Sequence, residues 1–136
     1  MTSDGTVITG AGILPIETRA GQERLIGNIT LDSDQFGQIV GYENHSGQTF
    51  LDQGAQAFGR VSRGAGNNTT DEHEGVRYHN VIATYLHGPL LPRNPQIADF
   101  LIQAALARRG IQQPLSTLAI DQVAAAAHDT AENRPR

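Results

Sequence analysis

The chain has 136 residues, of which 38% are hydrophobic, and this composition indicates one globular domain rather than a disordered chain. Its formal net charge of -4, with both signs mixed along the chain, argues against a nucleic-acid partner, because neutralising phosphates requires a basic face. The sequence contains no cysteine, which excludes disulfides, thiolate metal sites and a thiol nucleophile supplied by these residues.

The first residues have neither the basic residue nor the apolar run of a signal peptide, and the longest apolar runs are too short to span a bilayer. A cytoplasmic location is therefore the default expectation, and no membrane span is predicted.

Short strands and glycine-rich turns are predicted for the first half of the chain. Residues 4–20 are expected to form turns around one brief apolar run. Residues 24–32 alternate, with Leu25, Ile29 and Leu31 on one face, and this alternation predicts a half-buried strand.

A second strand is predicted over residues 38–43, followed by a polar turn at 44–47, and a third strand over 58–62. Residues 64–75 are rich in glycine and polar side chains, which predicts an exposed, mobile loop. Residues 81–86 form the most continuous apolar run, which is typical of a central strand covered on both faces.

Two helices are predicted after this strand. Asn94 is a suitable N-cap, Pro95 a suitable first helical residue and Gly110 a suitable C-terminal cap. Apolar residues recur at helical spacing along one face of this first helix: Ile97, Phe100, Leu101, Ala104 and Ala105. The second helix is expected over about 116–128, and residues 133–136 are expected to be a disordered tail. No linker divides the chain, so residues 1–136 are expected to belong to one domain.

His87 follows the apolar run directly and precedes Gly88 and Pro89, so it is expected on a sharp turn at the end of a strand. In open α/β sheets ligands bind at that edge, and a histidine there is a candidate general base. The alternative is a strand-end histidine that bonds a nearby carbonyl.

Glu43, Asn44 and His45 are the start of a dense polar segment whose glycine allows close backbone approach, which is typical of a ligand-facing loop. The alternative is a turn that satisfies its own hydrogen bonds. Arg24 opens a strand and could clamp a carboxylate with its guanidinium, or be a solvated charge. The histidines match no closed zinc pattern, so no metal site is predicted.

Three stretches together resemble the cobyric-acid-synthase-like branch of class I glutamine amidotransferases. They are residues 41–47 (GYENHSG), 66–68 (GNN) and 84–95 (TYLHGPLLPRNP). Within this branch the similarity is greatest to the glutaminase subunits of lipid II isoglutaminyl synthases. The resemblance covers nearly the whole chain to about Gly110. It implies an α/β fold: the C-terminal part of a flavodoxin-like amidotransferase domain, with a β-rich first half followed by two C-terminal helices.

The resemblance implies a cysteine–histidine glutaminase, in which a thiolate attacks the side-chain amide of glutamine and a histidine carries the proton. His87 matches the catalytic histidine and Arg24 a substrate-binding arginine; substrate binding is also assigned to Glu43, Asn44 and His45. The implied partner is a Mur-ligase-like synthetase subunit that uses ATP and Mg²⁺ to activate the glutamate of the lipid II stem peptide, so no cofactor is expected in this chain.

The sequence departs from the family pattern at two points. The family's cysteine elbow lies ahead of the matching region, so the chain is expected to be inactive alone and to self-associate through uncovered strand edges. Pro89 stands where other class I branches place a glutamate, and the third member of the triad is expected from the partner. The alternatives are a non-catalytic ligand-binding or docking module, a relative that amidates cobyrinic acid, and an unrelated hydrolase using Ser46.

Overall fold

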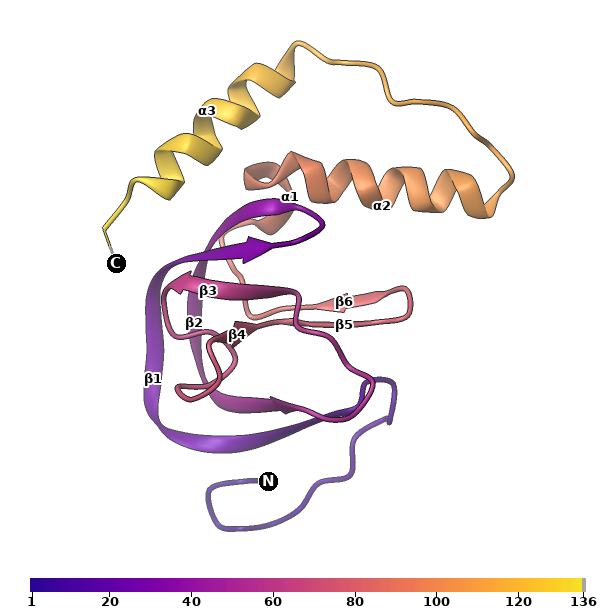
Figure 1. Cartoon of the computed structure of the whole chain (residues 1–136). Coiled ribbons are helices and arrows are strands. Elements are labelled where there is room, and N and C mark those ends of the chain that lie inside the picture. The colour runs from indigo at the N-terminus through magenta and orange to yellow at the C-terminus, as the bar shows by residue number, and fades with distance from the viewer. Residues whose placement is uncertain (136) are drawn as a thin grey trace.

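Antiparallel β-structure makes up the first half of the chain, and helices follow it (Figure 1). The computed structural model describes residues 1–135, and Arg136 of the predicted tail lies outside them. The strands are β1 (Ile16–Ser33), β2 (Gly37–Leu51), β3 (Gly59–Arg63), β4 (His73–Glu74), β5 (Val76–Tyr78) and β6 (Val81–Ala83). The larger sheet has the order β2-β1-β3-β4, and β5 pairs with β6 in a separate hairpin. The predicted fold, a β-rich half followed by C-terminal helices, is confirmed.

The two long strands β1 and β2 form a curved hairpin that supports the rest of the molecule (Figure 1). The strand predicted over 24–32 lies within β1, and Leu25, Ile29 and Leu31 are buried as expected. The prediction of turns over residues 4–20 was wrong for 17–20, which pair with β2. Glutamate and alanine, at positions 17 and 20, are depleted in strands, so this part of β1 depends on its partner strand.

The predicted polar turn at 44–47 was wrong, because these residues continue β2 without interruption. Side chains alternate between the two faces of this strand, and His45 and Thr49 are buried. A polar residue can occupy a buried strand position when another part of the chain supplies its hydrogen bonds, and sequence spacing does not reveal that supply.

The exposed loop predicted over residues 64–75 was wrong for 66–68 and 74–75, which are buried, whereas 69–70 and 72–73 are exposed. Asn67 and Asn68 are fully buried, and both use their side chains to bond backbone. The amide of Asn67 donates to the Gly75 carbonyl at 3.0 Å and accepts from the Gly75 N–H at 2.8 Å. The segment therefore packs over the sheet, and β4 pairs with the predicted third strand, observed as β3.

The predicted central strand over 81–86 was also wrong. Only Val81–Ala83 is a strand, it pairs antiparallel with β5, and Val81 is 37% exposed. A short apolar run does not by itself distinguish a central strand from a hairpin strand that leads into a buried residue, here Leu86.

Three helices follow: α1 (Leu90–Arg93), α2 (Pro95–Arg108) and α3 (Ile120–Glu132). The predicted start of α2 at Pro95 is confirmed, and Gly110, with φ +75°, lies just beyond its end. Asn94, however, does not cap the helix with its side chain; it bonds both the N–H and the carbonyl of Val40 at 2.9 Å. The second predicted helix is observed as α3, and it begins four residues later than its predicted start near 116.

The core lies where the helices meet the turn between β1 and β2. Phe36 in that turn contacts Phe58 and, edge-on, Phe100 of α2. The buried cluster consists of Ile29, Leu31, Ile39, Phe58, Leu86 and Ile97. Of the apolar face predicted for α2, Ile97 is buried and Leu101, Ala104 and Ala105 are exposed. Within residues 1–135 no helix has the length and apolar character needed to cross a membrane.

Candidate active site

His87 lies at the surface beside the middle of β2. Its N–H donates to the Tyr42 carbonyl at 2.7 Å, and the Tyr42 N–H donates to the His87 carbonyl at 3.3 Å. The His87 side chain is exposed. The histidine is thus outside the core, and its backbone is paired with a strand of the main sheet.

The residues on either side of His87 explain why the chain turns there. Leu86 is 7% exposed and packs on Gly41, where a Cβ atom would lie 2.9 Å from Leu86 Cδ2. Gly88 has φ +80°, a left-handed conformation that glycine adopts without strain, and α1 begins soon after it. The buried leucine and the glycine turn together hold His87 at the strand edge.

Alternation along β2 divides the predicted substrate-binding residues between two faces. Tyr42 and Asn44 are partly exposed on one face, whereas Glu43 (0% exposed) and His45 (9%) are buried on the other. Paired residues of antiparallel strands share a face, so His87 lies on the same face as Tyr42 and Asn44.

Arg24 joins this face from β1. Its Nε donates to Asn44 Oδ1 at 2.6 Å. The structure therefore brings together three of the predicted site residues, Arg24, Asn44 and His87, along the exposed face of β2. We call this set the β2 row.

Glu43 lies beneath the β2 row. Its carboxylate accepts hydrogen bonds from the backbone N–H groups of Ala65, at 3.0 Å, and Gly66, at 2.9 Å. Charge-assisted bonds of this kind are strong in a buried setting. The carboxylate holds the 64–66 segment against β2.

His45 lies beneath the row as well. Its ring stacks on Tyr85, with centroids 3.7 Å apart and an interplanar angle of 4°. Nδ1 lies 2.8 Å from the Gly47 carbonyl, so this nitrogen carries the proton and donates it. Nε2 is buried with no hydrogen-bond partner among residues 1–135. The ring therefore orients Tyr85, the second residue before His87.

Glu74 is a third buried group that the sequence analysis did not assign to the site. Burial, and to a lesser extent the nearby carboxylate of Glu43, raise the pKa of Glu74 to about 7, against hydrogen bonds from Tyr85 and Thr84 that lower it.

Tyr42, whose backbone pairs with His87, was not identified from the sequence either. Continuing the strand alternation through residues 42–45 would have placed Tyr42 and Asn44 on one face. No such signal exists for Glu74, because its segment has the composition of an exposed loop.

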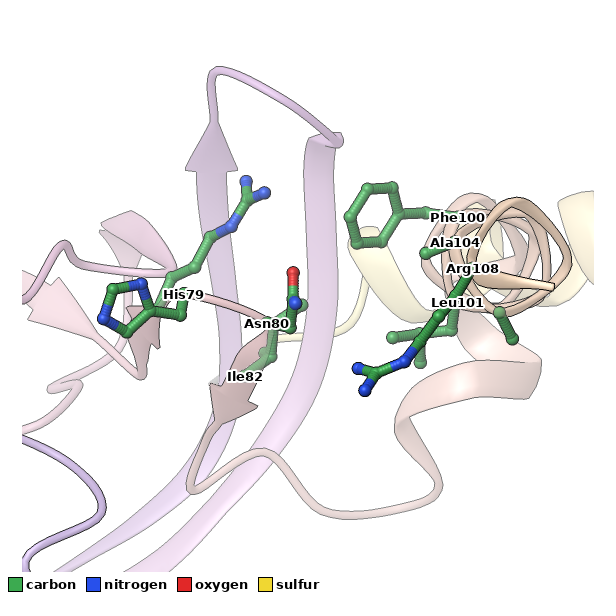
Figure 2. Close-up of a pocket in the computed structure, with 9 residues that line it drawn as sticks. His79, Asn80, Ile82, Phe100, Leu101, Ala104 and Arg108 are labelled. Carbon is green, nitrogen blue, oxygen red and sulfur yellow. The ribbon is translucent and has the colours of Figure 1, made fainter. Parts of the chain in front are cut away.

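Two cavities of the described residues are lined by none of the residues of the β2 row. Figure 2 shows the groove between the β5–β6 hairpin and α2, with a volume of about 370 Å³; His79, Asn80 and Ile82 line it from the hairpin, and Phe100 and Leu101 line it from α2. A smaller cavity of about 140 Å³ is lined by Thr18, Thr49, Thr84 and Tyr85 among others. Within residues 1–135 no cluster of histidine and acidic side chains is arranged to hold a metal ion.

Residues 1–95 match the CobB/CobQ-like glutamine amidotransferase domain. The chain belongs to this family, as its motifs predicted. It is 49% identical over 111 residues to subunit GatD of the glutamine-hydrolyzing lipid II isoglutaminyl synthase of Staphylococcus aureus, covering 82% of this chain and 45% of that protein.

The corresponding subunit of Streptococcus pneumoniae is 38% identical, with 79% of this chain and 42% of that protein covered. The cobyric acid synthase of Listeria innocua is 32% identical, with 63% of this chain and 17% of that protein covered. The chain thus spans less than half the length of the lipid II isoglutaminyl synthase subunits that it matches. The roles of His87, Arg24, Glu43, Asn44 and His45 stay predictions.

Proposed function

We propose that this chain contributes the proton-carrying histidine, His87, to the glutaminase subunit of a lipid II isoglutaminyl synthase. The observation that supports it is the β2 row, which combines a base, an amide and a guanidinium on one exposed face in a family of glutamine amidotransferases. The identity of 49% to a GatD subunit, against 32% to a cobyric acid synthase, favours lipid II over cobyrinic acid as the setting.

Each residue of the β2 row has a distinct role in this proposal. Arg24 binds the α-carboxylate of glutamine; its Nε is engaged by Asn44, which orients the terminal nitrogens of the guanidinium as a fork for the carboxylate. His87 takes the proton from a thiol and returns it to the leaving ammonia. Because the sequence has no cysteine, that thiol comes from outside these residues.

Ammonia released in this way would be used by a synthetase subunit. We propose a Mur-ligase-like partner that binds ATP and Mg²⁺, activates the glutamate of the lipid II stem peptide and supplies the third member of the triad. The proposal includes a cytoplasmic location. Co-purification with such a subunit, followed by amidation of a stem-peptide acceptor, tests this part separately from the glutaminase.

Ammonia release from glutamine tests the glutaminase. We expect the isolated chain to release no more ammonia than its His87→Ala variant. Fusing the chain to the part of the Staphylococcus aureus relative that it does not cover, which the proposal expects to carry the thiol, should restore turnover. His87→Ala in that fusion should lower kcat by about a thousandfold or more. Arg24→Ala should mainly raise KM. A fusion that keeps its rate without His87 would refute the proposal.

A further inference from the structure

One buried carboxylate fastens the segment that leads into His87. Glu74 Oε2 accepts a hydrogen bond from the Thr84 hydroxyl at 2.9 Å, and Glu74 Oε1 accepts one from the Tyr85 N–H at 2.7 Å. The Leu86 N–H in turn donates to the Thr84 hydroxyl at 3.0 Å. Three successive residues before His87 are therefore held by Glu74, two directly and one through a hydroxyl.

Glu74 is itself a fixed anchor. It is 0% exposed, and its carbonyl accepts from the Phe58 N–H at 3.1 Å as β4 pairs beside β3. The next residue, Gly75, is clamped on both sides of its backbone by the Asn67 amide. A group held this firmly can transmit its position to the residues that bond it.

The His87 ring has no hydrogen-bond partner of its own among residues 1–135, so its location is set through the backbone. On one side the backbone is paired with Tyr42, and on the other it continues into the segment bonded to Glu74. We propose that Glu74 is a positioning residue for His87, acting through Thr84 and Tyr85. This inference rests on the proposed function, in which His87 carries the proton.

The charge of Glu74 should matter to this positioning, because bonds to a carboxylate are stronger than bonds to a neutral acid. Glu43, reaching from β2, is the charged group that faces Glu74, and the other contacts come from the uncharged Thr84 and Tyr85. Burial and Glu43 hold the pKa of Glu74 near 7, so both bonds change in strength around neutral pH.

Nuclear magnetic resonance of the full chain across neutral pH tests the proposal. We expect the backbone amide signals of Tyr85, Leu86 and His87 to shift together with one midpoint, and Glu74→Gln to abolish this shared shift. Glu74→Gln should also lower hydrogen-exchange protection at these amides about tenfold relative to Ile29 in β1. Glu72→Gln makes the same substitution at an exposed position and should change neither measurement.

Thr84→Val removes the relaying hydroxyl and keeps the carboxylate. It should lower protection at Leu86 and His87 and preserve the titration at Tyr85. If Glu74→Gln does not fold, the amide shifts of the wild type across neutral pH and the exchange protection of Thr84→Val decide whether Glu74 positions His87. A shared shift that survives Glu74→Gln, its absence from the wild type, or unchanged protection at Leu86 in Thr84→Val would overturn the inference. None of these measurements needs glutamine turnover. They can therefore contradict the positioning role of Glu74 while the proposed function stands, and they can support that role while the glutaminase test fails.

Discussion

Glu43 and Glu74 show how single residues set the environment of the candidate site. Both carboxylates are 0% exposed, and both accept hydrogen bonds from backbone N–H groups, at Ala65 and Gly66 for one and at Tyr85 for the other. Removing such an acceptor leaves buried donors unsatisfied, which costs more than the bond itself contributes. These two buried acidic residues are therefore part of the scaffold of the candidate site.

Gly41 is the residue whose substitution most directly tests how His87 is held. A methyl group at this position would lie 2.9 Å from Leu86 Cδ2, so Gly41→Ala should displace Leu86 and lower the free energy of unfolding by about 1–3 kcal/mol. Urea denaturation measures the change. Gly10→Ala is the matched control, since nothing lies within 4 Å of a Cβ there, and it should change stability by less than about 0.5 kcal/mol.

Combining Gly41→Ala with Leu86→Ala removes most of the side chain that the new methyl group meets. The cost of the double variant should be smaller than the sum of the two single costs, as expected for residues in contact. Strictly additive costs would show that Leu86 does not pack on Gly41.

At the scale of whole elements, periodic apolar patterns could be predicted and polar burial could not. The buried face of β1 follows from the alternation of Leu25, Ile29 and Leu31, and Pro95 marks the start of α2. The polar part of β2 was predicted as a turn because His45 is buried through contacts with distant residues, Tyr85 among them. Such contacts depend on the tertiary structure, which overrides local propensity.

The same limit applied to the candidate site. His87 could be found from its place after an apolar run, and Arg24 and Asn44 from family motifs, but their assembly on one face depends on the register of β1 and β2. Glu74 could not be found, because its segment has the composition of a loop. Its position becomes evident only in the folded structure, where Glu74 of β4 accepts hydrogen bonds from Thr84 and Tyr85 in the segment after β6.

Glu74 also makes the stability of the fold depend on pH. Its pKa is raised from 4.5 to about 7 in the folded state, so between these values the folded state holds a proton that the unfolded state releases. This contribution to stability is complete below about pH 4.5 and is lost as the pH rises through about 7. The slope should reach at most about 1.4 kcal/mol per pH unit.

Denaturant unfolding at several pH values across this window measures the slope. Glu74→Gln removes the titrating group, so the difference between wild type and variant should change with pH over this window and level off above it. Glu72→Gln should run parallel to the wild type. A difference between wild type and Glu74→Gln that is constant with pH would contradict the raised pKa.

At the scale of the whole molecule, the sheets and the core form one body from which the far ends of α2 and α3 extend (Figure 1). The C-terminal half of α3 is anchored: His128 Nδ1 donates to the Arg93 carbonyl at 2.7 Å, and Ala131 is buried. Its first half is not covered, since Ile120 is 60% and Val123 62% exposed, as is Leu118 just before it, at 60%. Apolar surface gathered in this way promotes association.

We therefore expect the chain to self-associate in solution. Light scattering should give a mean mass above the 14.6 kDa of one chain, rising with protein concentration, because pairing removes exposed apolar surface of α3 from water. Ile120→Lys combined with Val123→Lys should return the mass to that of a single chain and leave unfolding unchanged, since neither side chain is in the core. Gln122→Lys, on the same helix, should keep the association. A mass that stays at 14.6 kDa at every concentration would show that this uncovered surface does not drive assembly.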